Sequence, residues 1–213
     1  MRKRKQRDLF LAAGMLAAFL LWTAAVRLVD VRAIGPRETA VGFAAVNGFV
    51  HDLTGVHMVL YTVTDWLGLV PLAVAMGFAG LGLAQWIRRK RLLKVDRSIL
   101  ALGGFYLVTM AAYILFELLP INYRPVLIEG RLEVSYPSST TMLALCVMPT
   151  AAMQLKARIK NAGLRKWVSA GITGFAVFMV VGRLLSGVHW FTDIVGGVLL
   201  SGGLMGLYRY ASD

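Results

Sequence analysis

Residues 182–193 read Gly-Arg-Leu-Leu-Ser-Gly-Val-His-Trp-Phe-Thr-Asp, and three of them carry reactive groups. His189 and Asp193 are four residues apart, so on a helix they share one face, where the carboxylate holds the imidazole in one tautomer. Arg183 precedes the pair at the end of an apolar run, and a guanidinium binds phosphate oxygens in a forked geometry. Because polar groups are costly in such apolar surroundings, these residues indicate a functional site.

The surrounding chain is strongly apolar. Its 213 residues are 58% hydrophobic, and a mean hydropathy of +0.67 is unusual for a soluble domain of this length. The net charge is +12, but the basic residues form blocks between apolar runs, which is typical of a membrane protein and not of a nucleic-acid-binding protein. The composition therefore predicts an all-α integral membrane protein with no nucleic-acid partner.

Six apolar stretches are candidate transmembrane helices, which we expect to form one bundle in a single membrane domain, 1–213. They cover residues 9–29, 58–87, 98–119, 139–157, 167–183 and 189–208. The first stretch is too long for the core of a signal peptide and has no clear cleavage site after it, so we expect it to be retained.

Two packing features are visible within these stretches. Gly202 and Gly206 have the spacing of closely packed helices. The single cysteine, Cys146, lies inside an apolar run, and we expect it to be a small packing residue and not a redox or zinc-binding group.

Blocks of basic residues define the expected orientation. They lie in the basic segment 1–8, between the second and third spans, and between the fourth and fifth. Together with Arg209, 17 of the 23 basic residues fall on one side, which the positive-inside rule makes cytoplasmic. We therefore expect a plasma (inner) membrane protein with both termini in the cytoplasm and with residues 30–57, 120–138 and 184–188 on the outer face.

The outer segment 30–57 is predicted to contain a helix between the first and second spans. Pro36 is a residue type that opens helices, and a partly apolar run follows it. We expect this helix to lie in the membrane interface on the outer surface, where it can cover the entry to a site. The alternative is a plain connector.

Two further polar clusters lie on the same predicted face as His189. Ser138, Ser139 and Thr140 open the fourth span, where hydroxyls and the first backbone N–H groups of a helix bind phosphate well. The alternative for this cluster is simple helix capping. Arg124 follows the third span and supplies another guanidinium. Together the clusters predict a phosphate-binding site.

These clusters resemble the motifs of the type 2 phosphatidic acid phosphatase family. The family's third motif, Arg, five residues, His, three residues, Asp, is matched in full by residues 183–193. The second motif, Pro-Ser-Gly-His, is matched at Pro137 and Ser138, and the Arg-Pro that ends the first motif is matched at Arg124. The motifs also follow the family's order along the spans, over a core of about residues 98–209.

The resemblance implies a lipid phosphatase. His189 would attack phosphorus and form a phosphohistidine, and Asp193 would orient it. Arg124, Arg183 and Ser138 would hold the phosphoryl oxygens together with nearby N–H groups and stabilise charge in the transition state. Water would then release phosphate. The family needs no metal or other cofactor, and the expected substrate is a lipid phosphate in the membrane.

The chain departs from the family pattern at two positions. Thr140 replaces the histidine that protonates the leaving group, which threonine cannot do at neutral pH. Glu117 replaces the lysine of the first motif, and it either pairs with an arginine or stays protonated. General acid catalysis contributes about 10²–10⁴-fold, and a phosphate leaving group needs it less than an alcohol does. We therefore expect a preference for a lipid pyrophosphate, such as undecaprenyl or another polyprenyl pyrophosphate.

Other residues and functions stay open at this stage. Asp65 lies inside the second span, where a carboxylate usually faces the protein interior, and it is either a substitute acid or the partner of an arginine. We expect His51 and His57 to be interfacial. A relative that only binds or moves a phospholipid and a phosphotransferase are the alternative functions, although an oriented nucleophile favours the hydrolase.

Overall fold

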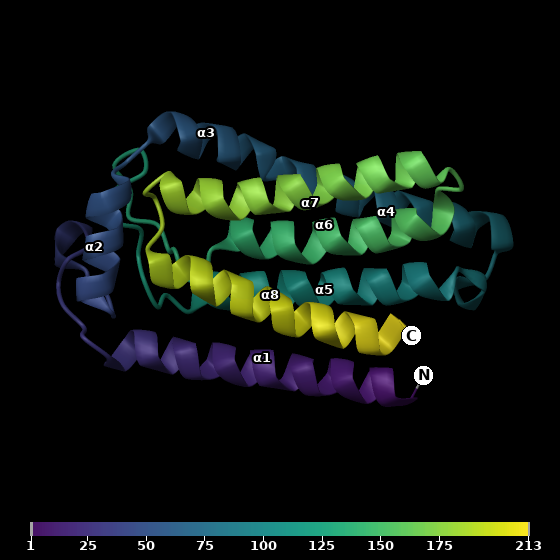
Figure 1. Cartoon of the computed structure of the whole chain (residues 1–213), viewed down its shortest axis with the longest axis horizontal. Coiled ribbons are helices and arrows are strands. Elements are labelled where there is room, and N and C mark those ends of the chain that lie inside the picture. Colours follow the sequence, from purple (N-terminus) through teal and green to yellow (C-terminus); the bar gives the residue numbers. More distant parts are fainter. Residues whose placement is uncertain (1, 213) are drawn as a thin grey trace.

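The computed structural model describes residues 2–212, and within them the chain forms eight α-helices and two 3₁₀ turns (Figure 1). The α-helices are α1 (Arg2–Leu28), α2 (Ala44–Thr54), α3 (Met58–Leu67), α4 (Leu69–Arg89), α5 (Arg97–Leu118), α6 (Ser139–Arg158), α7 (Ala162–Leu185) and α8 (Phe191–Ser212). The 3₁₀ turns are η1 (Pro36–Glu38) and η2 (Leu92–Lys94). The prediction of an all-α fold is confirmed.

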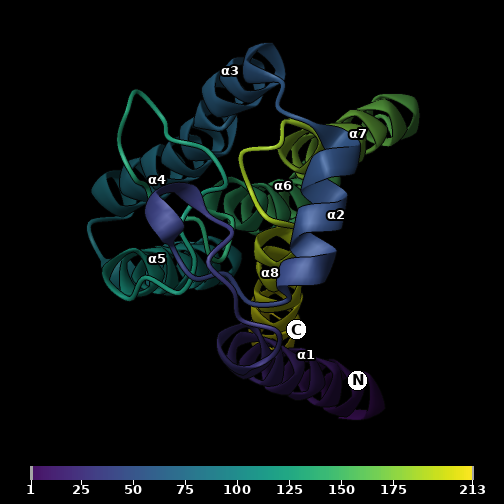
Figure 2. The same cartoon turned by 90° about the vertical axis from the view of Figure 1, so that its left-hand side faces the viewer.

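Five helical stretches of the described chain are long and apolar enough to cross a membrane. They are α1, α3 with α4, α5, α7 and α8, and their mean hydropathy ranges from 1.4 to 2.2. The remaining predicted span, α6, has 20 residues but carries more polar side chains. It lies among the others and packs against α4, α5, α7 and α8 (Figures 1 and 2). Length and composition thus confirm five of the six predicted spans. The sixth, α6, is a more polar helix that is buried among them.

The predicted span 58–87 is broken into two helices at Gly68. The N–H of Gly68 donates to the carbonyls of both Thr64 and Asp65, each at 3.0 Å, which is the tight pattern of a helix end. Pro71 has no N–H with which to continue the ladder. The break lets α3 pack against α7 while α4 packs against α5 and α6.

Glycines bring α1 and α8 together along their length (Figure 1). A methyl group added to Gly206 would lie 2.7 Å from Cβ of Ala12, and one added to Gly202 would lie 2.4 Å from Cε of Met15. This confirms the close packing predicted from the spacing of the two glycines. Cys146 is free and buried in the core, as expected for a packing residue.

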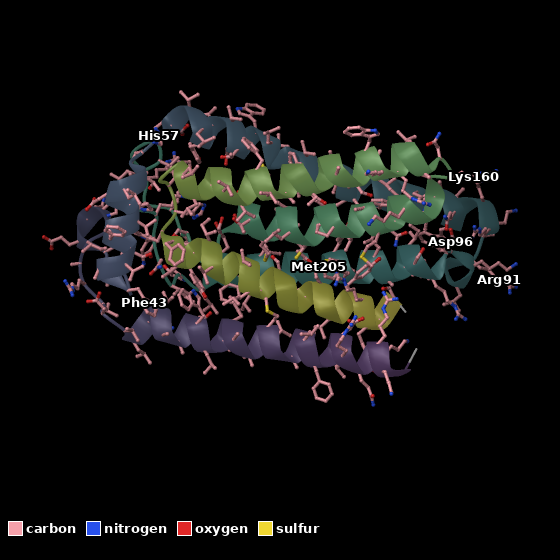
Figure 3. All side chains as sticks on the ribbon, in the orientation of Figure 1. Phe43, His57, Arg91, Asp96, Lys160 and Met205 are labelled. Carbon is pink, nitrogen blue, oxygen red and sulfur yellow. The ribbon has the colours of Figure 1, made fainter. Side chains whose placement is uncertain are left out.

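The two ends of the bundle carry different segments. We call one the terminal end, because α1 begins and α8 ends there (Figure 1). The polar loops that hold Arg91, Asp96 and Lys160 lie at the same end (Figure 3). We call the other the α2 end, because α2 lies across it, near His57 (Figures 2 and 3).

A helix within segment 30–57 is confirmed, but it begins at Ala44 and not near Pro36, which opens only η1. Three apolar side chains are exposed along one side of α2: Val46, Phe49 and Leu53. The opposite side holds the fully buried Asn47, whose side chain donates to Oγ1 of Thr192 at 3.0 Å. The helix is therefore tied to the start of α8 by a polar contact while its free face is apolar.

Candidate active site

His189 lies in the turn between α7 and α8, two residues before α8 begins at Phe191. The prediction that His189 and Asp193 share a helix face is therefore wrong, because only Asp193 is helical. Oδ2 of Asp193 accepts a hydrogen bond from the backbone N–H of Trp190 at 2.9 Å, as the third residue of a helix does in a capping box. This bond brings Oδ2 to 3.6 Å from Nδ1 of His189.

The turn that carries His189 is wedged against two other segments. Gly187 has a φ of +68°, and a methyl group there would lie only 1.9 Å from the carbonyl oxygen of Gly55. Glycine is thus required both for the backbone conformation and for the close approach. On the other side, the indole N–H of Trp190 donates to the carbonyl of Tyr123 at 2.8 Å. These contacts fix the turn between the α2–α3 connection and the α5–α6 loop.

Asp193 joins all three motif segments. Its Oδ1 accepts a hydrogen bond from Nδ2 of Asn122 at 3.0 Å, and its carbonyl accepts one from the N–H of Ser138 at 3.1 Å. Asp193 is completely buried, so its carboxylate needs donors. The sequence alone indicates no role for Asn122 beyond its position two residues before Arg124.

Arg183 lies in the last turn of α7 and is 1% exposed. Its Nη2 is 3.2 Å from Nε2 of His189. Because a guanidinium only donates hydrogen bonds, Nε2 is the acceptor, and the ring proton belongs on Nδ1, which faces Asp193.

The surroundings keep His189 neutral. Burial lowers the pKa of His189 well below its ordinary value of 6.5, and the positive charges of Arg124 and Arg183 lower it further. The imidazole therefore keeps a lone pair on Nε2 at neutral pH, which is the form that a nucleophile needs.

Arg124 is positioned by a small hairpin within the α5–α6 loop. Its N–H donates to the carbonyl of Glu133 at 2.9 Å, and the chain reverses at Glu129 and Gly130, both with positive φ. Arg124 is 8% exposed, and its Nε lies 2.9 Å from Oε2 of Glu133. The hairpin thus delivers a second, nearly buried positive charge to the α2 end.

Both guanidinium groups lie over one aromatic ring. The Cζ atoms of Arg183 and Arg124 are 5.1 and 5.7 Å from the ring centre of Tyr61, which belongs to α3. These are cation–π distances. Tyr61 was not foreseen, because nothing in the sequence connects it to two arginines more than 60 residues away.

Several buried polar atoms around His189 have no hydrogen-bond partner within the described residues. They are Nε and Nη1 of Arg124, Nε and Nη1 of Arg183, Oγ of Ser138 and Nδ1 of His189. Some of these atoms lie at ion-pair distance from carboxylates or, for Nδ1, 3.6 Å from Asp193. The side chain of Ser138 does not cap α6. Nη1 of Arg124, Nε of Arg183 and Oγ of Ser138 have no such carboxylate. Unpaired buried donors are costly, so these three atoms indicate an anion-binding site.

The two positions that depart from the family motifs, Glu117 and Thr140, lie at the edges of the candidate site. Glu117 is exposed near the end of α5 and lines a small crevice with Ser139 and Tyr136. The arginines have Glu133 and Asp65 as carboxylate partners instead. Thr140 faces the α3–α4 break, where a methyl group built on Gly68 would lie 3.6 Å from its Cγ2.

Three more residues singled out in the sequence have clear positions. Oδ1 of Asp65 is 3.5 Å from Nη1 of Arg183, and the Asp65 side chain is 54% exposed. The ring of His51 is half-buried, with its centre 5.5 Å from that of Trp190. His57 is exposed, and its ring nitrogen lies 2.8 Å from the carbonyl of Thr54. Only Asp65 contacts a charged group of the site.

Comparisons with known proteins show the family and the fold of the chain. No curated protein sequence matches the chain. Among solved structures it is similar to the one titled crystal structure of the first transmembrane PAP2 type phosphatidylglycerolphosphate phosphatase from Bacillus subtilis, with a TM-score of 0.54, 20% identity and 94% of each chain covered. That likeness shows a shared membrane-protein fold. The family model described as the PAP2 superfamily matches residues 101–213, which is more than half of the chain and includes every motif above. This multi-pass membrane protein belongs to the PAP2 superfamily.

Proposed function

We propose that the protein hydrolyses a lipid phosphate or a lipid pyrophosphate through a phosphohistidine on His189. The observation that carries this proposal is the environment of the imidazole. The imidazole of His189 is neutral, its Nε2 lies 3.2 Å from a buried guanidinium, and its Nδ1 faces a buried carboxylate. A group that merely binds an anion does not need this orientation.

In the first step, Nε2 of His189 attacks phosphorus, and the bond from phosphorus to the leaving group breaks. Nη2 of Arg183, which donates to Nε2 in the free site, turns to a phosphoryl oxygen. Arg124, Ser138 and the first N–H groups of α6 bind the remaining oxygens. The positive charge that develops on the imidazole is stabilised by Asp193, as in Ser-His-Asp sites.

In the second step, water attacks the phosphohistidine and releases phosphate, which restores the neutral imidazole. The same donors hold the phosphoryl oxygens in both steps, so the site needs no rearrangement between them. A phosphotransferase would differ only in accepting an alcohol instead of water.

The altered position Thr140 bears on the choice of substrate. An alcohol leaves as an unstable alkoxide unless it is protonated, whereas phosphate leaves as a stable anion. With no histidine at this position, we propose that a lipid pyrophosphate with a polyprenyl chain is turned over faster than a phosphate monoester.

The proposed side of the membrane is the outer one. Arg91 and Lys160 lie in the loops at the terminal end (Figure 3), whereas α7 ends and α8 begins at the α2 end, where the site residues of these helices belong (Figure 1). The positive-inside rule interprets these two ends as inside and outside. The apolar free face of α2 supports a position in the interface. A cysteine introduced at Leu53 should react with a membrane-impermeant maleimide in intact cells, whereas one introduced at Arg91 should react only after lysis.

The decisive experiment compares the purified protein with its His189→Ala variant in detergent. Phosphate release is measured from phosphatidic acid, farnesyl pyrophosphate and undecaprenyl pyrophosphate. We expect release to fall at least about 10³-fold in the variant, because the nucleophile is lost. If no lipid gives His189-dependent release, the enzyme proposal is wrong and a lipid-binding role remains.

A further inference from the structure

The proposed chemistry leaves the source of the leaving group's proton open. The described residues place two carboxylates against the arginines of the site, Glu133 on Arg124 and Asp65 on Arg183. Glu133 belongs to the hairpin that positions Arg124, since its carbonyl also accepts the N–H of that residue. Asp65 has no such backbone role toward Arg183, so its contact is made by the side chain alone.

Asp65 and His189 contact different terminal nitrogens of one guanidinium. Nη2 of Arg183 is 3.2 Å from Nε2 of His189, and Nη1 is 3.5 Å from Oδ1 of Asp65. In phosphoryl transfer the entering and leaving atoms are in line on either side of phosphorus, while cationic groups hold the oxygens between them. With Arg183 bound to those oxygens, the nucleophile lies beside one terminal nitrogen of the guanidinium and Asp65 lies beside the other.

Asp65 also lies one helical turn before Gly68, which packs against the position where the family's acid is missing. A methyl group built on Gly68 would lie 3.6 Å from Cγ2 of Thr140, and the N–H of Gly68 donates to the carbonyl of Asp65. The α3–α4 break therefore packs against Thr140 and carries Asp65 one turn away. A carboxylate on α3 stands near a side chain of α6 that cannot supply a proton.

Exposure distinguishes the two sides in the same way. The side chains of His189 and Arg183 are each 1% exposed, whereas that of Asp65 is 54% exposed. The lipid part of a substrate remains attached to the leaving oxygen and must be on the open side of the site. Asp65 is the carboxylate on that side of Arg183.

We infer that Asp65 transfers the proton to the leaving oxygen of monoester substrates, an inference that rests on the proposed function. A bound phosphate monoanion and the Asp65 carboxylate share one proton, as neighbouring acidic groups do. As the bond from Nε2 to phosphorus forms, the bond to the leaving oxygen breaks, and that oxygen takes the shared proton. The lipid alcohol leaves neutral, and Asp65 is a carboxylate again, ready to accept a proton from the attacking water.

This role concerns only poor leaving groups. A pyrophosphate substrate releases phosphate without needing the proton, so Asp65 widens the substrate range of a site that otherwise favours pyrophosphates. Removing the carboxylate should therefore lower the activity on a phosphate monoester more than the activity on a pyrophosphate.

The test is Asp65→Asn, assayed on phosphatidic acid and on farnesyl pyrophosphate in the same detergent preparation. We expect kcat on phosphatidic acid to fall about 10²–10⁴-fold and kcat on the pyrophosphate to change less than about 10-fold. The pyrophosphate activity also shows that the variant is folded. Adding Thr140→His to Asp65→Asn should restore much of the phosphatidic acid activity, because it returns an acid to the neighbouring position.

Glu133→Gln is the matched control, since it removes the carboxylate partner of the other arginine. It should change both activities in the same proportion. If Asp65→Asn also changes both in the same proportion, or leaves phosphatidic acid turnover unaffected, Asp65 is only a partner of Arg183 and the inference is wrong. A wild-type protein whose activities do not depend on His189 would instead overturn the proposed function.

Discussion

The two sides of Arg183 are constructed differently. On one side, His189 and Asp193 are buried, and Asp193 is held by hydrogen bonds from Trp190 and Asn122. On the other side, Asp65 is half exposed and Thr140 packs near a helix break. In the proposed mechanism the nucleophile is aligned before substrate binds, which agrees with the buried, hydrogen-bonded surroundings of His189, where the family motif is complete. On the side proposed for the leaving group, the chain departs from the motif at Thr140.

The largest difference between the two sides of Arg183 should appear when Asp193, on the side of His189, is substituted. Asp193→Asn keeps the shape of the side chain but removes the charge that fixes the tautomer of His189. The equivalent change in Ser-His-Asp enzymes costs about 10⁴-fold in kcat, and we expect a loss of about 10²–10⁴-fold in phosphate release here.

Asp96→Asn provides the control for that substitution. Asp96 is a carboxylate at the terminal end that pairs with Arg89 at 2.8 Å, far along the bundle from the site (Figure 3). Its activity should stay within about twofold of wild type. Equal losses in the two variants would mean that the effect comes from general destabilisation.

Asn122→Ala tests whether the support behind Asp193 matters. It removes one hydrogen bond to a buried carboxylate, and bonds to charged groups contribute about 1.5–3 kcal/mol, so we expect kcat to fall about 10–100-fold. Asn161→Ala is the matched change at the far end of the protein, where Asn161 caps α7 by accepting the N–H of Leu164 at 2.9 Å. Unchanged kinetics for Asn122→Ala would show that Asp193 needs no second support.

The smallest expected effect is a shift in the pH profile. The pKa of His189 is held well below 6.5, first by burial and then by Arg124 and Arg183. The active, neutral form is lost as the pH falls through this lowered pKa, so the acid limb of kcat/KM on farnesyl pyrophosphate should lie below pH 6.5. In Arg124→Gln one positive charge is removed, and the limb should move to higher pH, whatever the overall loss of rate. If the acid limb stays at the same pH in this variant, it reports the titration of a group other than His189.

Much of the architecture follows from hydropathy, because a bilayer demands long apolar helices. The residues at which the helices begin do not follow from hydropathy, because side-chain contacts determine them. Helix α7 begins at a cap made by Asn161, and α8 begins where Asp193 accepts the N–H of Trp190. That second contact is also why His189 lies outside the helix. The polarity of α6 is explained by its buried position, which a single sequence does not reveal.

The sequence predicts the site residues that belong to family motifs. It does not predict the residues that reach the site through contacts between distant parts of the chain. Arg124, Arg183 and His189 converge as expected, because their spans must be neighbours in one bundle. Tyr61 and Asn122 belong to no motif, and they act through partners more than 60 residues away. Only a folded chain shows that one ring contacts both arginines or that one amide supports Asp193.

The polarity of α6 has a consequence for synthesis. Thr150 shares a hydrogen bond with the hydroxyl of Tyr106 on α5 at 3.0 Å, and Gln154 donates to the hydroxyl of Tyr208 on α8 at 2.9 Å. A helix with such groups has a weak tendency to enter lipid alone. Gln154 also donates to the carbonyl of Ser98 on α5 at 3.3 Å, but because α8 emerges from the ribosome after α6, its bond to Tyr208 forms only when α8 has been made. The same helix carries Asp193, so the synthesis of α8 completes both the packing of α6 and the candidate site at the amino end of α6.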